Sequence, residues 1–201
     1  KLPDGLDWAD AGPLLCGGIT VFNPLLQFGV RPTDRVAVIG IGGLGHLALQ
    51  FANAWGCEVT ALTSEEKMAE AERMGAHACV NSRDPAALKA ARSRFDLILS
   101  TVNVPMDWET LLAALRPKGR LHLLGAVLEP MAIPVFALLP GQRQISSSPV
   151  GAPAALDTMM RFAARHGVRP VTEHFPMSGI NEAFVRLENG EARYRIVLDR
   201  E

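Results

Sequence analysis

The sequence predicts an α/β fold in which a doubly wound, parallel sheet of six strands carries helices on both faces. Three observations support this prediction. A short apolar run at 35–39 leads directly into glycines, a helical pattern follows the glycines, and further apolar runs alternate with helical stretches. Short runs rich in β-branched residues are typical of strands buried on both faces of a parallel sheet.

The glycines after the first predicted strand have the spacing Gly-x-Gly-x-x-Gly, at Gly40, Gly42 and Gly45. We expect Gly40 to permit a tight turn, Gly42 to let a diphosphate approach bare backbone, and Gly45 to let the next helix lie close to the sheet. The start of that helix offers free N–H groups to phosphates. The alternative is a turn without a ligand. The strand before and the helix after favour a dinucleotide-binding loop of Gly40, Gly42, Gly43, Leu44 and Gly45.

The other elements are predicted from apolar periodicity and from turn residues. Further strands are expected at 58–63, 78–80, 95–100, 120–124 and 143–148, the last at the sheet edge, and helices at 44–55, 66–74, from 85, and 108–115. Before the sheet we expect a short helix capped by Asp7 or Asp10 and a helix at 19–28 kinked by Pro24. After it come helices at 155–166 and 180–187 and strands at 171–176 and 194–199. The predicted units are a leading helical segment (1–30), a dinucleotide-binding domain (31–152) and a C-terminal segment (153–201).

Composition excludes several classes of function. The 201 residues are 48% hydrophobic and 20% charged, as in an ordinary soluble α/β protein, and the net charge is −1 without a basic tract. No nucleic acid partner is therefore expected. No apolar run approaches the roughly 20 residues of a membrane helix, and no signal peptide opens the chain, so no membrane partner is expected. Cys16, Cys57 and Cys79 form an odd, scattered set that argues against disulfides and fits the cytoplasm.

The end of the second predicted strand bears on which dinucleotide binds. Sites for NAD usually carry Asp or Glu here, whereas this chain has Thr63 and Ser64, with Lys67 three residues on. Hydroxyls and an ammonium group suit a 2′-phosphate, so the sequence favours NADP over NAD. In the other interpretation Ser64 only caps the next helix, and a carboxylate of Glu65 or Glu66 turned inward would repel the phosphate.

Other candidate residues lie at strand ends or within elements. Ligands bind beyond the carboxyl ends of parallel strands, so Thr101 and Gly125 are placed to line the crevice. His46 is expected to pack at a helix surface or between domains, His122 to be a satisfied core residue, and His174 to be a strand residue. On spacing alone, the favoured interpretation of Cys16 is a small buried side chain, and metal ligation is the alternative.

Three stretches resemble the zinc-dependent medium-chain alcohol dehydrogenases, and among them the cinnamyl alcohol dehydrogenase-like branch. They are Pro13-Leu14-Leu15-Cys16-Gly17-Gly18-Ile19-Thr20-Val21-Phe22, Val30-Arg31-Pro32 and 36–46, and the resemblance extends over essentially the whole chain. It implies that Cys16 is one ligand of a catalytic zinc and that Thr20 and Thr101 contact the cofactor. It also implies that Gly125 lies against the nicotinamide, and that the backbone around Ser148 and Val150 meets the carboxamide. Pro149, which lacks an N–H, departs from that pattern.

The function implied by the resemblance is hydride transfer between NADP(H) and a primary alcohol or aldehyde, with zinc as the Lewis acid of the full-length enzyme. The other zinc ligands belong to an N-terminal β-rich catalytic domain that this sequence does not contain. We therefore expect the chain alone to bind cofactor without turnover, and we assign it no catalytic residue. The family also implies a homodimer through the edge at 143–148. The C-terminal segment, including Ala192-Arg193-Tyr194-Arg195, is expected to be less ordered or to pack differently from the family.

Other functions stay open at this point. The chain could be a non-catalytic nucleotide-binding module, or a zinc-free quinone or enoyl reductase of the same superfamily. The segment Leu15-Cys16-Gly17-Gly18-Ile19-Thr20 disfavours the reductase, which has no use for a zinc thiolate. A methyltransferase would need an acidic residue at Thr63 or Ser64 and is also disfavoured.

Overall fold

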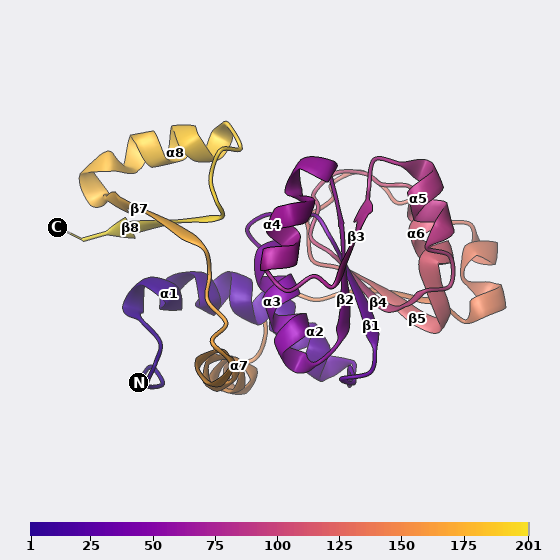
Figure 1. The fold of residues 1–201 in the computed structure, drawn as a ribbon, viewed down its shortest axis with the longest axis horizontal. Helices are drawn as coiled ribbons and strands as arrows, with labels where there is room; N and C mark the ends of the chain where they lie inside the picture. Colours follow the sequence, from indigo (N-terminus) through magenta and orange to yellow (C-terminus); the bar gives the residue numbers. More distant parts are fainter. Residues whose placement is uncertain (201) are drawn as a thin grey trace.

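A computed structural model describes residues 1–200, and its main feature is a six-stranded parallel sheet (Figure 1). The strand order is β3-β2-β1-β4-β5-β6, which is the doubly wound order and confirms the predicted fold class. The strands are β1 (Arg35–Ile39), β2 (Glu58–Thr63), β3 (Ala78–Asn81), β4 (Phe95–Ser100), β5 (Leu115–Leu123) and β6 (Gln144–Ser147).

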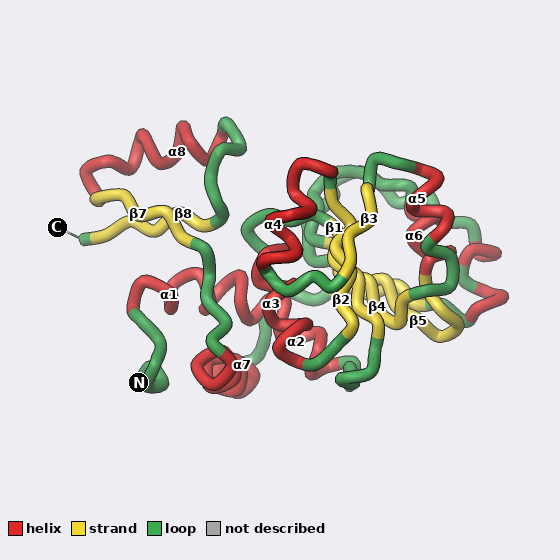
Figure 2. Tube along the Cα trace, viewed as in Figure 1, coloured by secondary structure: helices red, strands yellow, loops and turns green. Residues whose placement is uncertain are grey.

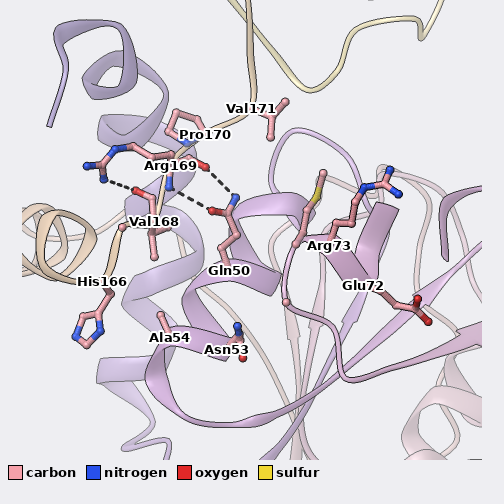
Figure 3. Close-up of a pocket in the computed structure, with 13 residues that line it drawn as sticks. Gln50, Asn53, Ala54, Glu72, Arg73, His166, Val168, Arg169, Pro170 and Val171 are labelled. Carbon is pink, nitrogen blue, oxygen red and sulfur yellow. Dashed lines mark hydrogen bonds between the residues drawn. The ribbon is translucent and has the colours of Figure 1, made fainter. Parts of the chain in front are cut away.

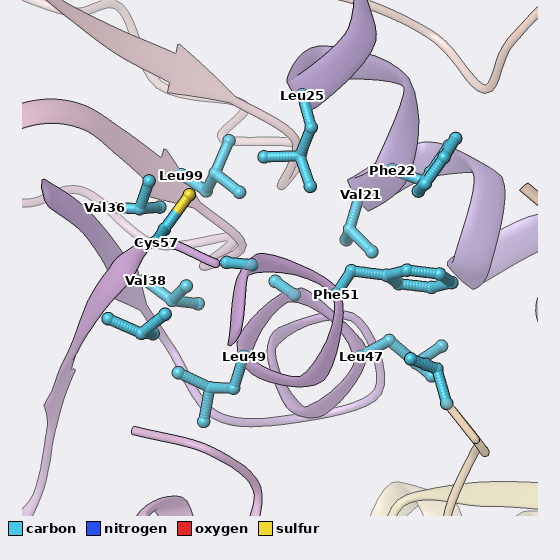
Figure 4. Close-up of a cluster of buried hydrophobic side chains, with 14 of the residues drawn as sticks. Val21, Phe22, Leu25, Val36, Val38, Leu47, Leu49, Phe51, Cys57 and Leu99 are labelled. Carbon is cyan, nitrogen blue, oxygen red and sulfur yellow. The ribbon is translucent and has the colours of Figure 1, made fainter. Parts of the chain in front are cut away.

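Helices cover both faces of this sheet because its strands are apolar on both sides. Along β1, Val36 and Val38 belong to one buried cluster and Ala37 and Ile39 to the other, as alternation along a strand requires. Helices α3 (Gly45–Trp55) and α4 (Met68–Arg73) lie on the first face, and α5 (Pro85–Ala90) and α6 (Trp108–Ala114) on the second. Figure 4 shows the first cluster, with the strand valines facing the side chains of α3.

The chain before the sheet is helical from Trp8 to Gln27. It consists of α1 (Trp8–Pro13), a π-helical turn η1 (Leu14–Gly18) and α2 (Ile19–Gln27). Asp7 caps α1 as predicted, by accepting a hydrogen bond from the amide of Ala9. The π turn, which contains Cys16, was not predicted. Helix α2 packs on α3 through the rings of Phe22 and Phe51, whose centroids lie 5.2 Å apart.

Several predicted ends differ from the structure by one or two residues, and two elements differ further in how they begin. Strand β5 begins at Leu115 rather than at 120, because Leu115 already pairs with Phe95 before the register shifts between Phe95 and Leu97. The residues from Arg116 to Gly119 form an irregular excursion in that strand, and Lys118 has a φ of 65°. The helix expected at 66–74 starts as a 3-10 turn, η2 (Glu65–Lys67), and becomes α-helical in α4. Two further 3-10 turns, η3 (Val135–Ala137) and η4 (Leu139–Gly141), precede β6.

The C-terminal segment forms a second unit beside the main sheet. Its elements are α7 (Pro153–His166), β7 (Thr172–Pro176), a 3-10 turn η5 (Met177–Gly179), α8 (Ile180–Glu188) and β8 (Arg195–Asp199). Strands β7 and β8 form a two-stranded parallel sheet with α8 beside it, apart from the six-stranded sheet (Figures 1 and 2). Within residues 1–200, no helix combines the length and the apolar character needed to cross a membrane.

Candidate cofactor-binding site

The glycine turn between β1 and α3 has a backbone that other residues adopt only at a cost. Gly40 has a φ of +86°, a conformation that L-residues rarely take. A Cβ on Gly45 would collide with the carbonyl oxygen of Gly40, so the start of α3 lies directly against the turn. Around Gly42, in contrast, no atom lies within 4 Å of the place of a Cβ. The backbone at Gly42 therefore faces open space.

The amide groups of this turn are free to bind an anion. Among residues 1–200, the N–H groups of Gly43 and Leu44 donate to no protein acceptor. The first backbone bond of the helix that follows is donated by His46 to the Gly42 carbonyl, at 3.1 Å. Unpaired amides at the start of a helix attract phosphate groups through their hydrogens and through the helix dipole.

The ends of β4 and β5 approach the same turn. The hydroxyl of Thr101 lies 2.6 Å from the Gly40 carbonyl oxygen and 3.1 Å from that of Ile39. Gly125 donates from its amide to the Ser100 carbonyl at 3.1 Å, and a Cβ on Gly125 would collide with the carbonyl of Val102. The structure thus brings the predicted residues Thr101 and Gly125 together at the carboxyl edge, with Thr101 in contact with Gly40.

Arg195 is the residue of this site that sequence reasoning missed. The Arg195 Nε atom lies 3.3 Å from the place of a Cβ on Gly43, and a Cβ on Gly17 would collide with the guanidinium group. The side chain therefore passes between the π turn and the glycine turn. Its Nε is buried and has no hydrogen-bond partner within the described part of the chain. Only the resemblance of residues 192–195 to a family motif had drawn attention to this position.

The polar residues after β2 form a second corner of the site. Thr63 is buried, and Ser64 precedes the turn η2. The Lys67 ammonium group donates to the carbonyl oxygen of Ile41 at 3.0 Å, so its charge lies next to the glycine turn. Glu66 is exposed, and the Ser64 hydroxyl beside it lowers the pKa of the Glu66 carboxyl, with a smaller effect from Arg83 at 3.8 Å.

The residues predicted for the nicotinamide end already make hydrogen bonds within the chain. The Thr20 hydroxyl donates to the Cys16 carbonyl at 2.7 Å, and the Val150 carbonyl accepts from Asn23 at 3.1 Å. The Ser148 hydroxyl lies 3.0 Å from Nε2 of His122.

The histidines take the structural roles expected of them. His122 is fully buried between the hydroxyls of Ser146 and Ser148, and burial lowers its pKa to about 4, which confirms a satisfied core residue. His174 is a strand residue of β7, with Nδ1 2.9 Å from the Asp199 carboxylate. His46 does pack between units, but it is fully buried rather than on a helix surface.

The three cysteines lie apart from one another among the described residues, and each is an unpaired thiol. The Cys16 thiol is exposed in the π turn, so the expectation of a buried side chain was wrong. Within residues 1–200, no three His, Cys, Asp or Glu side chains are grouped to hold a metal ion. One thiolate does not build a zinc site, which needs three or four protein ligands. Cys57 and Cys79 are also unpaired thiols, and burial raises the pKa of Cys57 to about 12.

A groove of about 700 Å³ lies away from this edge, between the end of α3, the end of α4 and the segment after α7 (Figure 3). Gln50 spans it with two hydrogen bonds to the Arg169 backbone, at 2.8 and 3.2 Å. None of the predicted site residues lines this groove. Through these two bonds, Gln50 on α3 anchors the segment that leads to β7.

Comparison with known proteins gives a consistent family. The family model described as a zinc-binding dehydrogenase matches residues 43–165. The aldehyde reductase AdhA of Synechocystis is 54% identical over 199 residues, which cover 98% of this chain and 59% of that protein. A cinnamyl alcohol dehydrogenase from Sorghum bicolor superimposes with a TM-score of 0.94 at 39% identity, over 99% of this chain and 57% of the other. One from Helicobacter pylori, complexed with NADP(H), has a TM-score of 0.86 at 29% identity, over 99% and 57%.

Two consequences follow from these comparisons. The chain spans less than 60% of the length of these relatives. Because the superposition on the Sorghum structure includes the C-terminal segment, the expectation that this segment packs differently from the family was wrong. The reason is that its contacts, from Gln50 and His46 to the segment after α7, are made within this chain. The chain belongs to the zinc-binding dehydrogenase family.

Proposed function

We propose that this chain binds NADP(H) at the carboxyl edge of its main sheet, as the cofactor part of a dehydrogenase that interconverts a primary alcohol and an aldehyde. One observation carries the proposal. The free amides of Gly43 and Leu44 and the guanidinium group of Arg195, with its unpartnered Nε, lie at the same turn. A diphosphate is the anion that such donors fit, through charge-assisted hydrogen bonds.

Bound NADPH would supply the hydride for aldehyde reduction and bound NADP⁺ would accept it in alcohol oxidation, while this chain's residues bind and orient the cofactor. Thr20 and Thr101 use their hydroxyl hydrogens for backbone carbonyls, so each oxygen keeps a lone pair that can accept a hydrogen bond. Gly125 presents bare backbone at the same edge. We assign these residues, with the backbone of Ser148 and Val150, to the nicotinamide end.

The preference for NADP rests on the polar residues that follow β2. The Ser64 hydroxyl and the cations of Lys67 and Arg83 suit a 2′-phosphate, and the strand ends in Thr63 rather than in an acid. The Helicobacter relative whose structure holds NADP(H) supports the same choice. Glu66 opposes it, because its carboxylate competes for the same donors.

A zinc ion does not fit the described residues by themselves, because no three His, Cys, Asp or Glu side chains among them are grouped around Cys16 or elsewhere to hold it. That observation favours a second candidate function for the chain by itself, a nucleotide-binding module without turnover. A titration of NADPH fluorescence with and without added zinc separates the two. The module binds NADPH with no effect of the metal, whereas a complete active site oxidises alcohol in a zinc-dependent manner.

A homodimer is proposed through the free edge of β6, which ends the strand order of the main sheet. An unpaired edge strand presents backbone donors and acceptors to a second copy. Sedimentation that shows only monomer across micromolar concentrations would contradict it. The three unpaired thiols support a reducing compartment such as the cytoplasm.

The binding proposal is tested by titrating the chain with NADPH and with NADH. We expect NADPH to bind more tightly, and Arg195→Met to weaken NADPH binding about tenfold or more, since it removes a charged donor from the diphosphate. Arg161→Met, on the exposed face of α7, is the matched control and should change nothing. Equal binding by wild type and Arg195→Met would contradict the assignment.

A further inference from the structure

His46 occupies a buried position where three parts of the chain meet. Its Nδ1 lies 3.0 Å from the carbonyl oxygen of Gly42, and its Nε2 accepts a hydrogen bond from the amide of Val171 at 3.2 Å. Its ring stacks on that of Tyr194, with centroids 4.9 Å apart and planes at 13°. No part of the side chain reaches solvent.

These contacts fix the protonation of the ring. Burial lowers the pKa of His46 to about 4, so the imidazole is neutral near pH 7 and carries one hydrogen. The amide of Val171 can only donate, so Nε2 must be the acceptor and Nδ1 carries the hydrogen. His46 therefore donates twice to the Gly42 carbonyl, from Nδ1 and from its own amide.

Holding this carbonyl also sets the direction of the next amide. In a trans peptide the C=O and the N–H point in opposite directions. With the Gly42 oxygen turned toward His46, the Gly43 N–H points away from the helix, and it has no acceptor within residues 1–200. His46 thus directs one of the free donors of the glycine turn outward.

The other side of the ring connects to Arg195. The carbonyl of Val171 accepts from the amides of Tyr194 and Arg195, at 2.9 and 3.1 Å. One histidine therefore links the Gly42–Gly43 peptide to the strand whose first side chain lies over Gly43. From this juxtaposition we infer that His46 is a positioning residue for the diphosphate site. It fixes the position of the Arg195 guanidinium group relative to the Gly43 amide. This inference rests on the proposed binding of NADP(H).

The chain offers a matched control one helical turn away. Gln50 also lies on α3 and anchors the same segment, through two hydrogen bonds to the Arg169 backbone, but it does not touch Gly42 (Figure 3). His46→Phe keeps an aromatic ring and the backbone hydrogen bond to Gly42, and it loses both side-chain hydrogen bonds, to Gly42 and to Val171. His46→Asn keeps a short side-chain donor near the Gly42 carbonyl. Gln50→Leu releases the segment and leaves that carbonyl untouched.

The test measures binding of NADPH and of adenosine 2′-monophosphate, which lacks the diphosphate bridge, to the 201-residue chain by calorimetry. We expect His46→Phe to weaken NADPH binding about tenfold and to change binding of the monophosphate less than twofold. His46→Asn should recover part of the loss, and Gln50→Leu should bind both ligands within about threefold of wild type.

Three results would overturn the inference: NADPH binding unchanged in His46→Phe, an equal loss for both ligands, or a Gln50→Leu variant as weak as His46→Phe. An equal loss for both ligands would show that the histidine only supports the fold. A wild-type chain that binds neither ligand would instead refute the proposed function itself. Urea unfolding of each variant shows whether the chain is folded under the conditions of the titration.

Discussion

The hydroxyl of Thr101 donates a hydrogen bond of 2.6 Å to the carbonyl oxygen of Gly40, and so ties the end of β4 to the first residue of the glycine turn. This bond crosses between adjacent parallel strands at their carboxyl ends. It fixes the backbone that must stay open to a diphosphate. The Thr101 amide also donates to the Ile39 carbonyl at 3.0 Å, so the carboxyl ends of β1 and β4 are hydrogen-bonded to each other.

Thr101→Val, which keeps the shape and removes the hydroxyl, should lower the free energy of unfolding by about 1–2 kcal/mol, because the Gly40 carbonyl loses its partner. NADPH binding should weaken as the turn loosens. Thr101→Ser keeps the hydroxyl and should stay close to wild type. Urea unfolding and NADPH titration measure both effects, and a valine variant that matches the serine variant in both would refute this role.

Two glycine-to-alanine variants separate folding from binding. Gly42→Ala should leave the free energy of unfolding unchanged or raise it by about 0.5 kcal/mol, since its Cβ meets open space. It should nevertheless weaken NADPH binding, because that space is where the diphosphate is expected. Gly45→Ala should destabilise the fold by about 2 kcal/mol or more, because its Cβ would strike the Gly40 carbonyl. The prediction fails if Gly42→Ala binds NADPH as well as wild type does.

Stability should fall as the pH is lowered from about 6.5 to 4. Burial lowers the pKa of His46 and of His122 to about 4, against 6.5 for an ordinary histidine. In this interval the unfolded chain binds more protons than the folded chain does. Each histidine therefore lowers the free energy of unfolding by up to about 1.4 kcal/mol for every pH unit of acidification, and above pH 6.5 it has no effect on that free energy.

Urea unfolding at pH 7, 6 and 5 measures this slope. The carboxyls of Glu66, Asp107 and Glu173 have lowered pKa values and destabilise the fold mainly at lower pH, as they become protonated. A free energy of unfolding that is flat from pH 7 to 5 would show that the two buried histidines do not titrate as described.

The main sheet could be predicted from the sequence because local signals agree there. The apolar run at 35–39, the three spaced glycines and the periodic helix after them each specify the same strand-turn-helix unit. The early start of β5 could not be predicted. Pro117 and Gly119 mark a break in the pattern, and only the pairing of Leu115 with Phe95 shows that the strand begins before the break.

Arg195 and the roles of His46 could not be predicted for a related reason. Arg195 reaches Gly43 from a separate two-stranded sheet, and His46 binds Val171 far along the chain. Both contacts join residues far apart in the sequence, and neither produces a periodic pattern from which it could be predicted. The π turn at Leu14–Gly18 is likewise invisible to helical periodicity, because the residues on both sides of it are helical.

Cofactor selectivity should change with one substitution at the end of β2. Ser64→Asp places a carboxylate where NAD sites hold one to accept from the ribose hydroxyls, and it repels a 2′-phosphate. We expect NADPH to bind at least about tenfold more weakly and NADH no more weakly than to wild type. Competitive titration of the two cofactors measures the ratio. If both cofactors weaken equally, the Ser64 side chain, which makes no capping hydrogen bond to η2, does not contact the 2′-phosphate.

The most direct test of the central claim is a crystal structure of the chain grown with saturating NADPH. We predict density for the diphosphate within hydrogen-bond distance of the Gly43 and Leu44 amides, with the Arg195 guanidinium group against it. An empty turn, or a diphosphate bound elsewhere, would contradict the account.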